Sequence, residues 1–433
     1  MVGFSFEEIC KITDGEFFSA GTPDESTVTE ITADLKKIRN GCLFCCLQHR
    51  KYAAQCEMII ARLNGAAMVL GEINPYNYKI PFVRVSDSFS ALQSLTEVYR
   101  ARLKTKIIGI TGTVGKTTTK EMLASVLSQK YRLYKTPESN NALSPVVDSV
   151  LSIRETDDFA VLELGIATPG EMEAMSRIVR PDIAVITNIG EAHLEGLKDL
   201  PTVLYEKSKI FDYMPSDGKI FLNRDDALLK NMTNVRGVSP DFFSRNDYTD
   251  PLPFPGEHFR LNAAAAAAVA KNLGFSHEEI AEGIARTVPA QQRCSVEKVG
   301  SVLFIDDYFN ANPMSMKAAI DMLCEMPYPR TAILGDMLEL GGRAESLHRE
   351  IGEYAASKQI DKLVFIGSQA EYMYLAAKET AADNKVVLHY ADIEAFQNSG
   401  DPATYTGGTV LLKASRGMIF EKVKEIILSR EQH

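Results

Sequence analysis

Glycines, threonines and lysines stand close together in residues 106–122, KIIGITGTVGKTTTKEM. An apolar run typical of a buried parallel strand leads into a turn with Gly112 and Gly115, and Lys116 then begins a helix. Glycines let successive backbone N–H groups point inward, and the helix N-terminus adds partial positive charge. Lys116 supplies an ammonium group for phosphate oxygens, and Thr117 supplies a hydroxyl for Mg²⁺. We therefore predict a binding site for a nucleoside triphosphate, formed by Gly112, Thr113, Gly115, Lys116, Thr117 and Thr118.

This turn departs from the common Walker A pattern, which has a glycine where Ile110 stands. The alternative interpretation is a strand-to-helix turn that contains Gly-Lys by chance. The apolar strand before the turn and the helix after it favour phosphate binding.

Polar side chains also stand near the ends of two further strand-like runs. Glu163 lies near the end of FAVLELG, and Asn188 and His193 lie at and just after the end of DIAVITNIG. Ligands bind outside the carboxyl ends of parallel strands, so we expect these side chains beside the phosphate-binding turn. Each residue alone is typical of a solvated loop or a structural hydrogen bond. Together, a carboxylate, an amide and an imidazole favour a magnesium and phosphate site.

Composition narrows the class of protein. The 433 residues are 45% hydrophobic and 24% charged, which is typical of a globular protein with substantial cores. A net charge of −10 argues against a nucleic-acid groove or an anionic membrane surface. We expect no signal peptide and no membrane span. The seven cysteines are odd in number, and Cys42-x-x-Cys45 has no matching second pair, so we predict reduced thiols in the cytoplasm.

Alternating strand-like and helical segments divide the chain into three α/β blocks. Residues 1–103 hold short strand-like runs, residues 104–293 have the βαβ order of a mainly parallel sheet, and residues 294–433 restart the alternation. We predict a small N-terminal domain, a central nucleotide-binding domain and a doubly wound C-terminal domain. The expected strands are residues 41–47, 66–70, 82–85, 106–110, 159–164, 182–186, 219–222, 302–305, 331–334, 362–366, 386–388 and 409–413, and the first block also has expected helices at 52–64 and 88–103.

A series of segments occurs in a characteristic order between residues 107 and 418: TGTVGKTTTKEM, ELG followed by PGEM, PDIAVITNIGEAHLE, GEHFRLNAAAA, IDDYFNANPMSMKAA, ILGDMLELG with LHREIG, and LLKASRGM. These segments resemble the Mur ligase family, and within it the MurF branch. The resemblance implies an N-terminal domain for a UDP-sugar, a central P-loop ATPase and a C-terminal Rossmann-like domain for the amine.

The resemblance also implies an activity. A Mur ligase of the MurF branch is an ATP-dependent amide ligase that adds D-alanyl-D-alanine to UDP-N-acetylmuramoyl-tripeptide through an acyl phosphate. It serves peptidoglycan synthesis, and with it cell-wall biogenesis, cell shape and cell division. We therefore expect small-molecule substrates, ATP and Mg²⁺ as cofactors, no nucleic acid and a cytoplasmic monomer.

The family's functional residues carry over by motif. The resemblance implies that the catalytic residues are Lys116, Glu163, His193 and Lys207. It implies that the Mg²⁺ ligands are Thr117, Glu163, His193 and Lys207, the last after carbamoylation by CO₂. It adds to the nucleotide site Asn262, Arg293 and Asp307. It implies that the substrate-side residues are Asn188, Tyr308, Asn310, Asn312, Asp336, Glu339, Lys413, Ser415 and Arg416.

Some positions depart from the family pattern. Asp34 is followed by Leu35 and Lys36 where the family has Asp-Ser-Arg, residues 48–58 lack the usual Asp-Gly-His, and the loop at 137–146 is short. Two alternatives therefore stay open. One is a Mur-like amide ligase with a different carboxylate acceptor, and the other is a nucleotide-binding protein that has lost catalysis. Retention of Lys116, Glu163, His193 and Lys207 counts against the second alternative.

Overall fold

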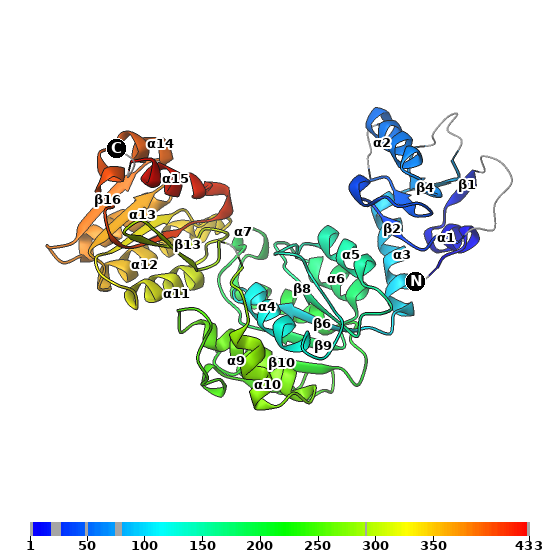
Figure 1. Ribbon diagram of the computed structural model, residues 1–433, viewed down its shortest axis with the longest axis horizontal. Helices are drawn as coiled ribbons and strands as arrows, with labels where there is room; N and C mark the ends of the chain where they lie inside the picture. Colours follow the sequence, from blue (N-terminus) through cyan, green and yellow to red (C-terminus); the bar gives the residue numbers. More distant parts are fainter. Residues whose placement is uncertain (1–2, 19–26, 48–50, 74–79, 291, 431–433) are drawn as a thin grey trace.

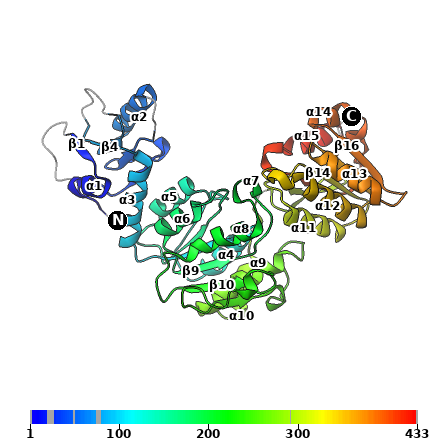
Figure 2. The same ribbon diagram turned by 180° about the vertical axis from the view of Figure 1, so that it is seen from behind.

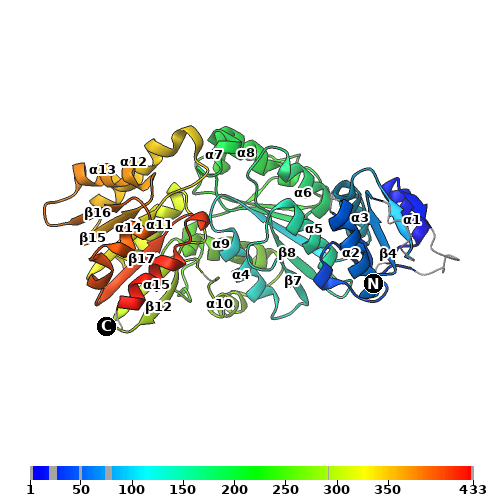
Figure 3. The same ribbon diagram turned by 90° about the horizontal axis from the view of Figure 1, so that it is seen from above.

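Three α/β units, each built on one sheet, follow one another along an elongated, bent molecule (Figures 1 and 3). The computed structural model describes residues 3–18, 27–47, 51–73, 80–290 and 292–430. Residues 48–50, part of the segment that lacks Asp-Gly-His, lie outside this description. The central unit lies between the N-terminal and C-terminal units, as the view from behind also shows (Figure 2). Within the described residues, no helix combines the length and apolar character needed to cross a bilayer.

The N-terminal unit has a five-stranded sheet in the order β1-β5-β4-β3-β2, parallel except for the pairing of β1 with β5. Asp34 caps a short 3-10 turn by accepting a hydrogen bond of 2.9 Å from the backbone N–H of Lys36. Its carboxylate thus has a local structural partner. The elements are α1 (Phe6–Thr13), β1 (Glu16–Phe18), β2 (Ile31–Thr32), η1 (Leu35–Lys37), β3 (Leu43–Cys45), α2 (Lys51–Leu63), β4 (Met68–Gly71), β5 (Phe82–Arg84) and α3 (Ser88–Arg102).

The central unit has a six-stranded, wholly parallel sheet in the order β11-β10-β9-β6-β8-β7. Strand β6 lies between β8 and β9, so the phosphate-binding turn lies between the strand ends of Glu163 and Asn188. The elements are β6 (Lys106–Thr111), α4 (Lys116–Leu127), β7 (Leu133–Lys135), α5 (Leu143–Ser152), β8 (Phe159–Glu163), α6 (Glu171–Val179), β9 (Ile183–Ile186), α7 (Leu194–Leu197), α8 (Leu200–Ser208), η2 (Lys209–Phe211), β10 (Lys219–Asn223), η3 (Leu229–Asn231), β11 (Asp241–Phe243), η4 (Arg245–Asp247), α9 (Phe259–Asn272) and α10 (His277–Ala285).

The C-terminal unit has six strands, in the order β12-β13-β17-β14-β15-β16, where we expected five. The additional strand β12 pairs antiparallel with β13 at the edge of an otherwise parallel sheet. Its sequence SVEKV is mostly exposed and charged, so it lacks the apolar run of a central strand. The elements are β12 (Ser295–Val299), β13 (Val302–Asp307), α11 (Pro313–Cys324), β14 (Arg330–Gly335), η5 (Gly341–Arg343), α12 (Ala344–Ser357), β15 (Lys362–Ile366), α13 (Ala370–Thr380), β16 (Val386–Tyr390), α14 (Ile393–Asn398), η6 (Asp401–Thr404), β17 (Gly408–Lys413), η7 (Arg416–Met418) and α15 (Glu421–Arg430).

Helix α3 joins the N-terminal unit to the central unit, and Arg100 near its end is a buried anchor. The Arg100 guanidinium donates hydrogen bonds to the backbone carbonyls of Val179 (2.7 Å) and Arg180 (3.0 Å). It also forms a 2.9 Å ion pair with Asp182, which precedes β9. The two carbonyls and the carboxylate would lose this donor if the helix moved. These contacts therefore hold α3 against the central sheet.

We expect Arg100→Leu to lower the free energy of unfolding by about 3 kcal/mol, because it leaves Asp182 without its cationic partner. Arg102→Leu is the matched control, since the Arg102 side chain is 32% exposed and pairs with Glu8 at the surface. We expect a change under about 1 kcal/mol for this control. Urea unfolding followed by circular dichroism measures both values, and equal effects of the two variants would contradict the anchoring role.

Candidate functional site

The phosphate-binding turn is held open by two glycines in conformations that other residues rarely adopt. Gly112 has φ +145° and Gly115 has φ +82°. A Cβ atom on Gly112 would lie 2.0 Å from the Thr187 hydroxyl oxygen, and one on Gly115 would lie 2.2 Å from the Asn262 side-chain oxygen. Both positions therefore require glycine on steric grounds as well as for backbone conformation.

Asn188 holds the turn from the neighbouring strand end. Its side-chain oxygen accepts hydrogen bonds from the backbone N–H groups of Thr113 (3.1 Å) and Val114 (2.9 Å), and its amide nitrogen donates to the Val114 carbonyl at 3.0 Å. We predicted Asn188 on the substrate side. In the structure its amide is committed to the shape of the phosphate-binding turn.

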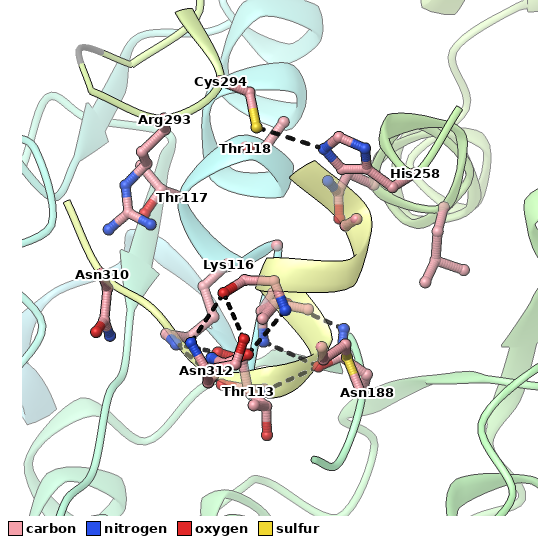
Figure 4. A pocket seen from close by; sticks show the side chains of 18 of the residues that line it. Thr113, Lys116, Thr117, Thr118, Asn188, His258, Arg293, Cys294, Asn310 and Asn312 are labelled. Atoms are coloured by element: carbon pink, nitrogen blue, oxygen red, sulfur yellow. Dashed lines mark hydrogen bonds between the residues drawn. The ribbon is translucent and has the colours of Figure 1, made fainter. Parts of the chain in front are cut away.

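A cavity of about 820 Å³ opens above this turn, between the central and C-terminal units. Figure 4 shows side chains that line it: Lys116, Thr117 and Asn188 come from the central unit, and Asn310 and Asn312 come from the C-terminal unit. Most of the predicted site residues line it: Gly112, Thr113, Gly115, Lys116, Thr117, Thr118, Glu163, Asn188, His193, Lys207, Asn262, Arg293, Asp307, Asn310, Asn312 and Lys413.

Glu163 is a fully buried carboxylate at the floor of the cavity. One of its oxygens accepts a 2.8 Å hydrogen bond from the Thr117 hydroxyl, and the other accepts a 2.6 Å hydrogen bond from the Asn141 amide. Ser139 lies beside them, 3.2 Å from the Thr117 hydroxyl, and accepts a 2.7 Å hydrogen bond from Arg293. Our sequence reasoning assigned no site role to Ser139 or Asn141, although the asparagine-rich PESNNA segment beside the phosphate-binding turn was a signal for them.

Two lysines, the buried Lys207 and the half-buried Lys116, meet at one carbonyl. The Lys116 ammonium donates to the Gly112 carbonyl at 2.9 Å, and the Lys207 amine donates to the same oxygen at 3.1 Å. Burial and the neighbouring Lys116 charge hold the pKa of Lys207 well below its usual range. Burial also lowers the pKa of Lys116, which Glu163 partly restores and Arg293 lowers further. The floor therefore concentrates positive charge in a protein of net charge −10.

His193 points toward the C-terminal unit. It has φ +54°, and its Nδ1 lies 2.5 Å from a carboxylate oxygen of Glu339. Burial lowers its pKa, and the contact with Glu339 opposes this effect. Two further contacts link the central and C-terminal units here. The Glu195 backbone N–H donates a 3.1 Å hydrogen bond to the Glu339 carbonyl, and Arg343 forms a 2.9 Å ion pair with Glu191. The central and C-terminal units thus touch directly beside His193.

The C-terminal unit contributes a second charged cluster. Asp307, at the end of β13, forms a 2.8 Å ion pair with Lys413 at the end of β17 and accepts a 3.2 Å hydrogen bond from the Cys294 backbone N–H. Lys413 also donates to the Asn310 carbonyl at 2.6 Å. The Cys294 sulfur lies 3.9 Å from Nε2 of His258, a residue whose pKa is lowered to about 4 chiefly by burial (Figure 4). The imidazole is therefore neutral in this wall of the cavity.

Five predicted substrate-side residues do not line the cavity: Tyr308, Asp336, Glu339, Ser415 and Arg416. Asp336 accepts a 2.7 Å hydrogen bond from the Ala370 N–H at the start of α13, and Ser415 accepts one of 2.9 Å from the Leu338 N–H. Tyr308 packs in the core of the C-terminal unit, and Arg416 pairs with Glu421 at the surface. A motif shows which residue type occurs at a position, whereas the backbone decides where its side chain points.

Comparison with known proteins reveals two domains along this chain. Residues 110–250 match the Mur ligase middle domain, and residues 292–416 match the Mur ligase glutamate ligase domain. The UDP-N-acetylmuramoyl-tripeptide--D-alanyl-D-alanine ligase of Bacillus subtilis is 31% identical over 94% of each chain. The chain belongs to the Mur ligase family.

Solved structures agree in fold with this Mur ligase. MurF from Acinetobacter baumannii superposes with a TM-score of 0.86 at 27% identity, covering 99% of each chain. The MurF ligase from Thermotoga maritima in complex with ADP superposes with a TM-score of 0.81 at 26% identity, covering 93% of this chain and 98% of the other. The prediction of three α/β units in the Mur ligase arrangement is therefore confirmed.

The donors for a metal ion are limited. Among the described residues, no group of three or more His, Cys, Asp and Glu side chains is placed to hold a metal by itself. Of the predicted ligands, Thr117 and Glu163 are in direct contact, whereas His193 contacts Glu339 and Lys207 carries an amine. Thr117 and Glu163 are thus the two predicted ligands whose oxygen atoms already lie side by side.

We expect Gly115→Ala to weaken ATP binding at least tenfold, about 1.4 kcal/mol, because the new methyl group collides with Asn262. Gly170→Ala is the matched control. Gly170 also precedes a helix with φ +86°, but a Cβ atom there would meet nothing within 4 Å. Isothermal titration calorimetry with ATP measures both affinities, and equal weakening by the two substitutions would refute the steric role of Gly115.

Proposed function

We propose that this Mur ligase is a MurF-type enzyme that joins D-alanyl-D-alanine to UDP-N-acetylmuramoyl-tripeptide with consumption of ATP, in peptidoglycan synthesis. The observation that supports this proposal most is the similarity to MurF proteins, which covers nearly the whole chain, including the N-terminal unit. An ADP-bound relative of the same fold supports the assignment of ATP to the central unit. The cavity between the central and C-terminal units is large enough for a nucleotide together with reacting groups.

The residues of the cavity suit the activation of a carboxylate. The carboxylate of the tripeptide attacks the γ-phosphorus of ATP, and ADP leaves as an acyl phosphate forms. The amine of the dipeptide then attacks the acyl carbon, loses a proton and displaces inorganic phosphate. Both steps bring anions together, so Lys116 and Arg293 lower the barrier by offsetting negative charge at the phosphates.

Mg²⁺ fits the floor of the cavity once Lys207 is carbamoylated. The Thr117 hydroxyl and the Glu163 carboxylate are hard oxygen donors of the type that Mg²⁺ prefers. When bound, the ion would neutralise negative charge on the phosphates. His193, which we expected among the ligands, contacts Glu339 through Nδ1 and would contribute its other ring nitrogen.

The carbamate on Lys207 has a chemical rationale in this site. Only a neutral amine attacks CO₂, and burial beside Lys116 favours the neutral form of Lys207 by lowering its pKa. The nitrogen forms a bond to the carbon of CO₂ and loses a proton, which turns a potential cation into an anion. This reversal of charge would relieve the repulsion from Lys116 and supply the missing oxygen ligand.

The substrate side is proposed in two parts. We assign the nucleotide to Gly112, Thr113, Gly115, Lys116, Thr117, Thr118, Asn262, Arg293 and Asp307, and the reacting groups to Asn310, Asn312 and Lys413. The remaining substrate-side predictions would act by shaping the C-terminal unit. These residues are Tyr308, Asp336, Glu339, Ser415 and Arg416. We propose a cytoplasmic monomer, because ATP is available in the cytoplasm and one chain contributes every residue used here.

A second candidate is a Mur-like amide ligase with a different carboxylate acceptor. The observation behind it lies in the N-terminal unit, where Asp34 caps its own turn and Leu35 and Lys36 follow it. The amide-forming chemistry is the same in both candidates.

We expect ADP release only when ATP, UDP-N-acetylmuramoyl-tripeptide and D-alanyl-D-alanine are all present, with a pentapeptide product detected by mass spectrometry. Lys116→Ala should reduce the rate at least about 100-fold while the fold persists, because its charge acts on the transferring phosphoryl group. Activity with a different acceptor, and none with the muramoyl tripeptide, would select the second candidate. No ATP-dependent product with any acceptor would refute both.

We expect Lys207→Ala to be nearly inactive and to regain part of its activity in acetate, which can supply an anionic oxygen ligand. Lys209→Ala is the control, since Lys209 follows in the chain but lies near Glu173 and Asp212 outside the cavity. Mass spectrometry of the native protein would show an added mass of CO₂ on Lys207 only. A fully active Lys207→Ala variant would rule out the carbamate.

A further inference from the structure

Lys120 is a buried cation whose role lies outside the site described so far. It stands one helical turn beyond Lys116 on the same face of α4 and is 0% exposed. Its ammonium donates to the Thr136 carbonyl at 2.8 Å and to the Glu138 carbonyl, and it lies 3.1 Å from a Glu121 carboxylate oxygen. An ammonium group has three N–H donors, so these three acceptors satisfy it fully.

The two carbonyls belong to a loop that carries polar groups into the cavity. We call residues 136–141 the brace loop. Within it, Ser139 lies 3.2 Å from the Thr117 hydroxyl, and Asn141 donates a 2.6 Å hydrogen bond to Glu163. The Thr136 hydroxyl in turn accepts a 3.1 Å hydrogen bond from the Glu163 backbone N–H. The brace loop therefore touches Glu163 at both its backbone and its carboxylate.

Lys120 also stabilises an unfavourable backbone conformation in this loop. Glu138 has φ +47°, a left-handed conformation that is unfavourable for a residue with a Cβ atom. Its side chain is exposed, so the side chain does not explain the conformation. The Glu138 carbonyl accepts a hydrogen bond from Lys120, which favours this backbone conformation.

The ammonium is close to the carboxylate of the site as well. Lys120 Nζ lies 3.9 Å from the Glu163 oxygen that accepts the Thr117 hydrogen bond, and both side chains are 0% exposed. At this distance in a buried setting, opposite charges attract strongly. Lys120 thus attracts the Glu163 carboxylate toward the brace loop.

We propose that Lys120 is a positioning residue that fixes the brace loop and the Glu163 carboxylate in the geometry needed for nucleotide-dependent ligation. The effect expected on ADP release rests on the proposed function. The effect expected on the order of the brace loop does not. Lys120 acts through Glu163, Ser139 and Asn141, and it is not among the residues that line the cavity.

Five substitutions test the proposal. Lys120→Met keeps the length of the side chain without its charge, and Lys120→Arg keeps the charge. Lys135→Met is the control, because Lys135 also pairs with Glu121 but its side chain is 46% exposed. Glu138→Val leaves Lys120 unchanged but disfavours the left-handed backbone conformation at residue 138. Glu138→Gly is its matched control, because glycine adopts that conformation readily.

Two measurements separate positioning from a general loss of stability. Hydrogen exchange of a peptide covering residues 136–142, without ligands, reports the order of the brace loop. The Mg²⁺ concentration for half-maximal ADP release, at saturating substrates, reports the Glu163 geometry. We expect Lys120→Met to speed exchange in this peptide and to raise the Mg²⁺ requirement about 10- to 100-fold, with substantial recovery in Lys120→Arg and no change in Lys135→Met.

Unchanged exchange and an unchanged Mg²⁺ requirement in folded Lys120→Met would overturn the proposal. If Lys120→Met does not fold, the comparison of Glu138→Val with Glu138→Gly tests the proposal. Both variants should fold, because the Glu138 side chain is exposed. We then expect faster exchange and a higher Mg²⁺ requirement in Glu138→Val than in Glu138→Gly, and equal behaviour would refute the role of the brace loop. Absence of product in the wild-type protein would count against the proposed function, whereas the exchange data would still test Lys120.

Discussion

The close approach of basic side chains at the floor of the cavity is the constraint on which the site depends. Lys116 and Lys207 donate to one carbonyl oxygen, that of Gly112, and Arg293 reaches the same floor through Ser139. Glu163 is the carboxylate that offsets part of this charge. Two ammonium groups that share one acceptor repel each other unless one amine is neutral or an anion lies between them. The polyphosphate of ATP would supply such an anion in a protein of net charge −10.

The parallel sheet of the central unit makes this concentration of charge possible. Because β8, β6 and β9 are neighbours, Glu163, the phosphate-binding turn and Asn188 meet at one edge although they are far apart in sequence. Asn188 braces the turn from one side, and the brace loop supports Glu163 from the other. The turn is therefore held from two directions before any ligand arrives, so little reorganisation is needed on binding.

The C-terminal unit completes the cavity with a cluster of its own. The ion pair between Asp307 and Lys413 joins two strand ends, and the Cys294 N–H ties the connection between units to the same carboxylate. On the opposite side, Glu339 and Arg343 contact the segment around His193. The orientation of the two units and the geometry of the charged residues are thus set by the same contacts. Movement of one unit would change both together.

The sequence by itself determined the family, the three α/β units and the phosphate-binding turn, because these depend on local spacing and on motif order. It did not reveal β12, whose charged edge-strand sequence resembles a loop, or the part played by Ser139 and Asn141. It placed Asp336 and Ser415 on the substrate side, and in the fold each accepts a hydrogen bond from a backbone N–H group of the C-terminal unit. Only the tertiary structure decided which polar side chains face the cavity, because that depends on partners distant in sequence and on the direction in which each strand end points.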